Sequence, residues 1–519
     1  MKNRHIKSPR SMQRGLIGIL LLVTIAVIAV TVFSKNIWGD DAKTYQQKVN
    51  QEALRQAKAA LLDYLVVGAV SSGIKDPFGT SNLGRLPCPD QDGNGVSEPS
   101  CGIGAGPYLL AGYHSLGLLP WATLNSSVIR DASQQCLWYA VDGLYKSNPA
   151  STPVNSDSFG SFSVVQPVKP TNPALLNTTW PIQTLAGDLT TVGVSANRVV
   201  AVIIASGSAG GTQTQTSVGG ATYACGLTKA VGGTPNAEAS APDFLKYYSP
   251  SINNQSLIPA SGTPVANPPY PATTPAGALT TFMTADVGQE QLNDQVVWIT
   301  AAEVAQATTR RVAQLYANQI NLYVSKTGFY PWAAATPGGK CQKNLLQGFV
   351  PYDCDVYPSG SNNSSSPTIS LAFGSGNFYN DIDNWAGQAH YAIAKDCVAK
   401  TSITLLSVIY PVSGSGGTLT HPCSNGSDRI NVGTGTNGPA AIILMQGRAL
   451  SNQSSCSPYS GSKTARDISL CLEDPTNIGT VHTAFTAPKS YSTTMYNSAP
   501  YKVPQTSGSN DYMVQFTTN

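Results

Sequence analysis

An uninterrupted apolar stretch from Leu16 to Phe33 is the strongest hydrophobic signal in the chain, and a short basic head precedes it. A helix over this stretch is about 27 Å long, which is enough to cross the hydrocarbon core of a bilayer. The head carries Lys2, Arg4, Lys7, Arg10 and Arg14, whereas the first acidic residue is Asp40. This asymmetry predicts a single membrane pass with the N-terminus in the cytoplasm and the bulk of the chain on the opposite side of the membrane.

Two later segments have the three-and-four spacing of amphipathic helices. The first covers residues 43–67, and its apolar face comprises Val49, Ala53, Ala57, Leu61, Tyr64 and Leu65. The second runs from Glu303 to Lys326, and its face comprises Val312, Tyr316, Ile320 and Tyr323. Thr300 and Glu303 stand in capping-box spacing at the start of the second helix. Both faces are suited to packing on a sheet.

Four short apolar segments rich in branched or aromatic residues predict strands. They are Cys136 to Val141, Val199 to Ala205, Val296 to Thr300 and Ala440 to Met445. Proline-rich composition predicts a surface loop or linker from Ile258 to Thr280, and a similar loop from Asn148 to Pro181. Helices interspersed with these strands predict an α+β fold.

The motifs recur in the same order later in the chain, which indicates an internal repeat. Gly84 to Cys88, after the first helix, matches Gly328 to Trp332, after the second. Three further matches have offsets of 253, 252 and 240 residues: Cys88 and Cys101 with Cys341 and Cys354, Asp131 and Tyr139 with Asp383 and Tyr391, and Asn197–Gly207 with Asn437–Gly447. We therefore expect two tandem domains, over residues 34–300 and 301–519.

All ten cysteines lie between Cys88 and Cys471, beyond the predicted membrane segment. An even number of cysteines in a translocated region predicts disulfides formed in an oxidising compartment. The equal separations of 13 residues predict two bonds, Cys88–Cys101 and Cys341–Cys354. Cys136 and Cys225 are then the remaining pair of the first domain. The pairing of Cys397, Cys423, Cys456 and Cys471 stays open.

Composition and motifs narrow the function classes. Only 11% of residues are charged and the net charge is +3, five of the basic residues being in the head, so nucleic-acid binding has no electrostatic footprint. The chain has no Gly-x-Ser-x-Gly elbow, phosphate-binding loop or His-Glu-x-x-His motif. His390 stands beside Tyr391 in an apolar segment, where a structural role is expected. We therefore expect no enzyme activity and rank an anchored periplasmic hydrolase last.

The junction Gln13-Arg14-Gly15-Leu16 resembles the leader of type IV prepilins and pseudopilins. The resemblance implies that prepilin peptidase cuts between Gly15 and Leu16 and that the new amino terminus is methylated. The family usually has Glu at the fifth mature position, which is Leu20 here. Large minor pseudopilins of type II secretion and some tip subunits also lack this Glu, so the resemblance implies a subunit outside the repeating filament body. The alternative interpretation is an ordinary signal-anchor helix.

Downstream, the stretches that begin at Leu86, Leu118 and Leu137 resemble those of large bacterial pilin-like proteins. The resemblance implies residues 1–15 as leader, 16–33 as transmembrane and assembly helix, and a continuation into a pilin-like helix packed on an antiparallel sheet. The second domain would be a further pilin-like α+β unit in tandem. Whether the helix is continuous through Gly39 stays open.

One loop has the spacing of a calcium site. Its oxygen ligands would be Asp90, Asp92, Asn94, the main chain of Val96, and Glu98, with Gly95 at the sixth position. Pseudopilins often hold calcium, so the family resemblance supports this cofactor. Cys101 stands where a bidentate Glu is usual, and the alternative is a glycine-rich turn closed by Cys88 and Cys101.

Together these features predict a minor pilin or pseudopilin that initiates or caps a type IV pilus or a type II secretion pseudopilus. The alternative is a cell-adhesion protein displayed at a filament tip or on the surface. The expected partners are prepilin peptidase, other pilins or pseudopilins and the inner membrane, and no nucleic acid. The expected location is the bacterial inner membrane and then the filament or cell surface.

Overall fold

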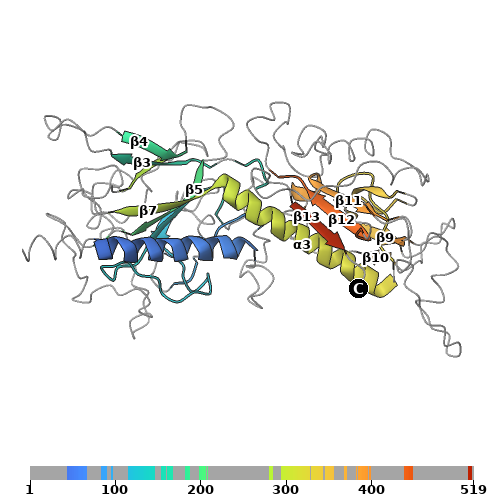
Figure 1. Cartoon of the computed structure of the whole chain (residues 1–519), viewed down its shortest axis with the longest axis horizontal. Coiled ribbons are helices and arrows are strands. Elements are labelled where there is room, and N and C mark those ends of the chain that lie inside the picture. Colours follow the sequence, from blue (N-terminus) through green and yellow to red (C-terminus); the bar gives the residue numbers. More distant parts are fainter. Residues whose placement is uncertain are drawn as a thin grey trace, which may run out of the picture.

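The structure is a computed structural model. It describes residues 44–66, 83–90, 95–97, 115–146, 154–158, 160–167, 182–187, 198–205, 207, 280–284, 294–327, 329–342, 345–355, 368–370, 382, 384–394, 397–398, 430, 438–447 and 512–516. These residues form an α+β architecture of helices and mainly antiparallel sheets (Figure 1). None of the described helices is long and apolar enough to cross a membrane. The predicted membrane stretch, residues 16–33, lies outside the described residues.

The first described helix covers residues 44–66, as the sequence predicts. Its buried face comprises Ala53, Leu54, Ala57, Leu61 and Leu65, none of which is more than 6% exposed. The helix forms because this three-and-four spacing places one apolar stripe against a sheet. Val49 and Tyr64, also predicted for the stripe, are partly exposed at its edges.

This helix packs on the first sheet, whose antiparallel strands β1, β2, β5 and β7 pair in that order. Three further strands, β3, β4 and β6, branch from the start of β5, where Phe162 pairs with Val199. The strands of the first sheet are β1 (Ser115–Leu118), β2 (Trp138–Val141), β3 (Phe162–Pro167), β4 (Ile182–Ala186), β5 (Val199–Ala205), β6 (Thr280–Met283) and β7 (Gln295–Thr300).

Strand β5 is buried along its whole length because both of its faces are covered. Val202 and Ile204 belong to a core with Phe162 of β3 and Phe282 of β6. Ala201, Ile203 and Ala205 instead belong to the core beneath helix 44–66. The register shifts between Val199 and Ala201, and such a bulge places two consecutive residues on one side. Val200 therefore joins Ala201 in the core beneath the helix.

The prediction of a loop from Asn148 to Pro181 is wrong over β3. Phe162, Val164 and Val165 are at most 4% exposed, so tertiary burial selects a strand in a stretch where Ser, Pro and Asn dominate the local composition. The other proline-rich segment, predicted from Ile258 to Thr280, lies outside the described residues except at Thr280, the first residue of β6.

Helix α3 (Ala301–Thr327) begins directly after β7. The predicted capping box is confirmed: Thr300 N donates to Glu303 Oε2 at 2.9 Å, and Glu303 N donates to Thr300 Oγ1 at 3.2 Å. The predicted apolar face is confirmed as well, since its four residues are at most 9% exposed. With 27 residues the helix is about 40 Å long.

The second sheet packs on α3 and is antiparallel, with the strand order β13-β12-β11-β8. The strands are β8 (Gln347–Phe349), β11 (Ala389–Ile393), β12 (Ala441–Met445) and β13 (Tyr512–Phe516). Strands β9 (Asp353–Asp355) and β10 (Thr368–Ser370) form a separate antiparallel pair. Trp385, which is 0% exposed, lies in the core between α3 and the second sheet.

The two sheets have the same topology around their helices. The pairing order β1-β2-β5-β7 in the first sheet corresponds to β8-β11-β12-β13 in the second. We call helix 44–66 with the first sheet the first unit, and α3 with the second sheet the second unit. The correspondence indicates that the sequence repeat is a repeat of structure.

Backbone hydrogen bonds outside the strand ladders recur between the two units. Asp142 N donates to Val200 O, and Ala394 N donates to Ala440 O, both at 2.8 Å. The donors are 252 residues apart and the acceptors 240 residues apart. Three more N–H to carbonyl bonds of the first unit have counterparts in the second. Leu86→Tyr145 corresponds to Tyr330→Cys397, Leu119→Leu137 corresponds to Val350→Ala389, and Asp90→Leu118 corresponds to Ala334→Phe349. These backbone hydrogen bonds therefore recur in the same order in both units.

The two helices run parallel where they meet. Lys58 Nζ lies 2.7 Å from Glu303 Oε1, and Arg311 Nη1 donates to Leu65 O at 3.1 Å. Residue numbers rise together along both helices at these contacts, which fixes the direction. The Lys58 and Glu303 side chains are partly exposed, so this pair contributes at most about 1 kcal/mol. Arg311 stands at the carbonyl end of helix 44–66, where the helix dipole favours a cation.

Candidate functional site

The loop that follows Cys88 in the first unit is anchored at both ends of its described part. Asp90 is buried at 1% exposure and exchanges two backbone hydrogen bonds with Leu118 at 2.8 and 2.9 Å. Its Oδ2 accepts the N–H of Gly95 at 2.6 Å. Gly95 O in turn accepts the N–H groups of Ala122 and Thr123. The carboxylate of Asp90 therefore holds a tight turn against the neighbouring segment.

The calcium site stays a prediction. Asp92, Asn94 and Glu98 lie outside the described residues, and Val96 is 50% exposed. Among the residues that the structure does describe, no group of three or more His, Cys, Asp or Glu side chains could hold a metal ion. The bond from Gly95 to Asp90 uses one of the carboxylate oxygens, which supports the turn interpretation.

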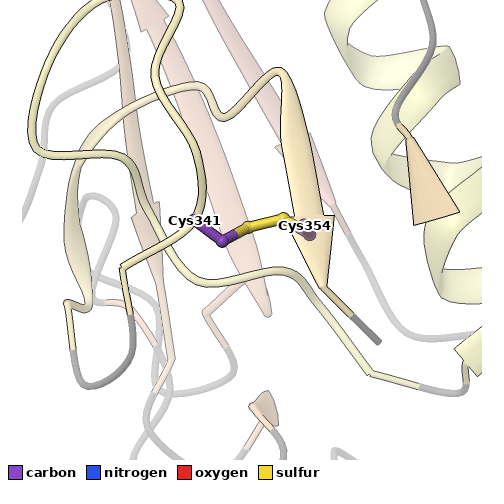
Figure 2. Close-up of a disulfide and its surroundings, with 2 residues drawn as sticks. All are labelled: Cys341 and Cys354. Atoms are coloured by element: carbon purple, nitrogen blue, oxygen red, sulfur yellow. A yellow bond between two sulfur atoms is a disulfide. The ribbon is translucent and has the colours of Figure 1, made fainter. Parts of the chain in front are cut away.

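In the second unit, the predicted disulfide between Cys341 and Cys354 closes a loop. The bond joins a loop segment to β9, with the two Cα atoms 5.0 Å apart (Figure 2). Tyr323 of α3 packs on both cysteines. Ala334 occupies the position that Asp90 has in the first unit, as their matching hydrogen bonds show. The second unit therefore lacks that carboxylate. Cys341 lies seven residues after Ala334, whereas Cys88 lies two residues before Asp90, so the expected match of Cys88 with Cys341 is not a match of structural positions.

The other described cysteines also form disulfides. Cys88, Cys136 and Cys397 are each disulfide-bonded, and no described cysteine is free. Cys101 and Cys225, the predicted partners of Cys88 and Cys136, lie outside the described residues, as do Cys423, Cys456 and Cys471. An oxidising compartment is the environment in which such bonds persist.

The processing residues Gly15 and Leu16 lie outside the described residues, and so does Leu20. The structure therefore adds no geometry to the cleavage junction, and processing stays a prediction from the sequence.

His390 is held in the second core rather than exposed in a cleft. It is 3% exposed, and its ring lies 5.3 Å from that of Phe349. Burial lowers the pKa of His390 to about 3, because an apolar environment disfavours the charged form. The imidazole is therefore neutral across the ordinary pH range, as a structural residue would be.

Two buried aspartates, Asp131 and Asp142, accept backbone N–H groups in turns. The sequence did not predict these hydrogen bonds. Asp131 accepts the N–H groups of Ser133 and Gln135 and that of Gly207, beyond the end of β5. Burial nevertheless raises the pKa of Asp131. Asp142 accepts the N–H groups of Leu144 and Ser161. In the sequence, Asp131 is marked by its recurrence as Asp383 in the internal repeat. Asp142 has no such mark, because the equivalent residue of the second unit is Ala394.

A buried cation lies on the same turn as Asp142. Lys146 is 0% exposed, and burial lowers its pKa to about 8, while the charge of Asp142 opposes this shift. The charge of Asp142 therefore offsets part of the cost of burying the Lys146 ammonium, and Lys146 N donates to Asp142 O at 3.1 Å in the turn after β2.

The tight turn at Gly95 gives a direct test of the loop. Gly95 has φ of +83°, and a Cβ at this position would overlap the indole ring of Trp121. We expect Gly95→Ala to lower the free energy of unfolding by about 2–5 kcal/mol, from left-handed backbone strain and displacement of the ring. Denaturant unfolding of the oxidised chain measures this loss.

Gly338→Ala is the control, because Gly338 shares the positive φ, at +64°. It should lose only the backbone contribution of about 1–2 kcal/mol. Equal losses in the two variants would contradict the packing of Gly95 against Trp121.

Comparison with known proteins finds no family model, no curated protein and no solved structure that matches the chain.

Proposed function

We propose that the chain is a minor pilin or pseudopilin, a structural subunit that initiates or caps a type IV pilus or a type II secretion pseudopilus. The observation that carries the proposal is helix 44–66, whose apolar stripe lies along an antiparallel sheet. The prepilin-like junction at Gly15 and the apolar stretch from Leu16 to Phe33 precede this helix in the sequence. A leader, an apolar segment and a sheet-bound helix in this order support a filament subunit.

The second unit supports a position at the end of a filament. A subunit in the filament body must leave room for neighbours at close spacing along the assembly helix, and a chain with two sheets and a shared long helix (Figure 1) is bulky. Leu20 removes the carboxylate that would pair with the amino terminus of a neighbour, and an unpaired charge in an apolar environment is costly. Both arguments favour one or a few copies at the tip.

In this role the chain would be a substrate of prepilin peptidase and a partner of other pilins or pseudopilins. It would first reside in the inner membrane, with both units outside the cytoplasm. Its disulfide-bonded cysteines support that side of the membrane.

An adhesin at the filament tip is the second candidate. Its supporting observation is composition: only 11% of residues are charged, so the surface is polar but weakly charged, and such a surface can carry ligand-binding loops without strong repulsion. An adhesin and a capping subunit share the same place in the filament, and they differ in whether a receptor is bound.

Quantifying this subunit against the major pilin or pseudopilin in sheared filaments tests the proposed position. We expect a ratio far below one, with the subunit confined to filament ends in immunogold images. Leu20→Glu is the matched variant, and it should leave this ratio almost unchanged, because steric bulk acts at every neighbour contact while a single buried ion pair adds little net stability. Near-equal amounts along the shaft would reject a tip subunit.

Deleting residues 301–519 would not remove the second unit alone. Ala301 and Val304 of α3 belong to the core of the first unit, so the deletion would also damage that unit. A chain that ends after Arg310 keeps these two residues and removes the second core.

A further inference from the structure

Helix α3 belongs to two hydrophobic cores. Its first turns contribute Ala301 and Val304 to the core beneath helix 44–66. Its later turns contribute Val312, Tyr316 and Ile320 to the core of the second unit. The helix also follows β7 without an intervening residue, since β7 ends at Thr300 and α3 begins at Ala301. The direct connection between the units therefore contains no linker in which a hinge could form.

Contacts between the units extend beyond the helix that they share. Leu83 precedes the first sheet in sequence, yet it is 1% exposed within the core of the second unit. Gln388 Nε2, just before β11, donates to Ser156 Oγ of the first unit at 2.7 Å. Both partners of this bond are 0% exposed. We call these residues, together with Leu65 and Arg311, the seam.

Arg311 lies where α3 contacts the end of helix 44–66. It is 3% exposed, and its Nη1 donates to Leu65 O at the end of helix 44–66. Burial lowers the pKa of Arg311 to about 10. Because burying a charged group away from water is costly, a loosely packed contact between the helices would leave this guanidinium in water. Its enclosure indicates that the two helices are closely packed here.

The backbone around Gly84 is equally enclosed. Gly84 has φ of +76°, and a Cβ at this position would lie 3.1 Å from Val154 Cγ1 and 3.5 Å from Thr308 Oγ1. The segment that carries Leu83 into the second core is thus clamped between a loop of the first unit and α3. The end of helix 44–66, the segment at Leu83 and Gly84, and the loop at Val154 and Ser156 therefore all contact α3 or the second unit.

From these contacts we infer that the two units form one rigid body, in which the seam fixes the orientation of the second unit on helix 44–66. The inference does not depend on the chain being a filament subunit. Its consequence is mechanical: a force or a bound partner at the second unit acts on helix 44–66 directly, without the slack that a flexible tether would introduce. The second sheet is also held at a constant distance from the first.

Pulsed electron spin resonance on the full chain tests the inference. Spin labels carried by non-canonical amino acids leave the disulfides intact, and exposed sites are available at Gln51 on helix 44–66, Gln183 on β4 and Gln515 on β13. The pair Gln51 and Gln183 reports on the first unit alone, and the pair Gln51 and Gln515 spans both units. We expect distance distributions of similar width for the two pairs. A markedly broader or bimodal distribution for the spanning pair would overturn the inference.

Variants then test whether the seam is responsible. Leu83→Ser combined with Arg311→Ala should broaden the spanning distribution at least twofold, while the pair within the first unit stays narrow and so verifies folding. Arg310→Ala is the control, because Arg310 is exposed on the same turn of α3, and it should change neither distribution. A spanning distribution that stays narrow in the seam variant would overturn the assignment of rigidity to the seam.

Discussion

We expect the natural chain to be cut after residue 15 and the chain with Gly15→Val to remain at full length. The prepilin-like junction places Gly15 directly before the apolar stretch, and the family resemblance implies that the peptidase cuts directly after this Gly. A branched side chain there should take processing from complete to undetectable. Intact mass measurement of the chain from membranes of cells with prepilin peptidase reports the result.

Gly18→Val is the matched control, because Gly18 lies three residues further on, inside the apolar stretch. That variant keeps the junction and should be processed like the natural chain. Normal processing of Gly15→Val, or a failure of both variants, would argue against specific recognition of the junction.

Trp385→Ala is expected to give the largest loss of stability among single core substitutions in the second unit. Trp385 is 0% exposed and is the largest fully buried side chain described. Its truncation leaves a cavity beside α3, and such changes typically cost about 3–5 kcal/mol. Because α3 also belongs to the first core, we expect one cooperative transition at lower denaturant concentration rather than loss of the second unit alone.

Guanidinium unfolding under non-reducing conditions, followed by fluorescence and circular dichroism, measures this change. Trp332→Ala is the control, because Trp332 is only partly buried at the edge of the same core, and its loss should be clearly smaller. Two separated transitions in Trp385→Ala, with the first unit unaffected, would contradict the shared core.

The elements with strong local patterns were predictable from the sequence. Strand β5 has the predicted bounds, and α3 differs from its predicted start at Glu303 by two residues. Strand β3 was missed because Phe162, Val164 and Val165 stand in a segment dominated by Ser, Pro and Asn, and their burial depends on β5 and β6. Local composition carries no information about such distant partners.

The internal repeat was predictable because residues at equivalent positions of the two sheets are similar and occur in the same order along the sequence. Tyr139 and Tyr391 lie on equivalent strands, β2 and β11, and both are at most 1% exposed. The seam left no comparable signal. Arg311 and Leu65 are 246 residues apart in sequence, and nothing in either local pattern indicates that an arginine would meet the end of the earlier helix.

The candidate site was predictable only in part. Spacing alone identified the Cys341–Cys354 bond, because a closed loop of fixed length is a local property. The role of Asp90 was harder to predict, since a carboxylate that accepts the N–H of Gly95 and one that binds calcium share the same spacing. The sequence could not distinguish these roles, because both place an acidic side chain at the start of a glycine-rich turn.

The central claim, a subunit of the type IV filament class, is tested most directly at the amino terminus of the natural chain. Purification from its native membrane and mass spectrometry of the N-terminal peptide give the start residue and its modification. The account predicts a chain that begins at Leu16 with a methylated amine. A chain that retains Met1, or one that begins beyond Phe33, would contradict the account.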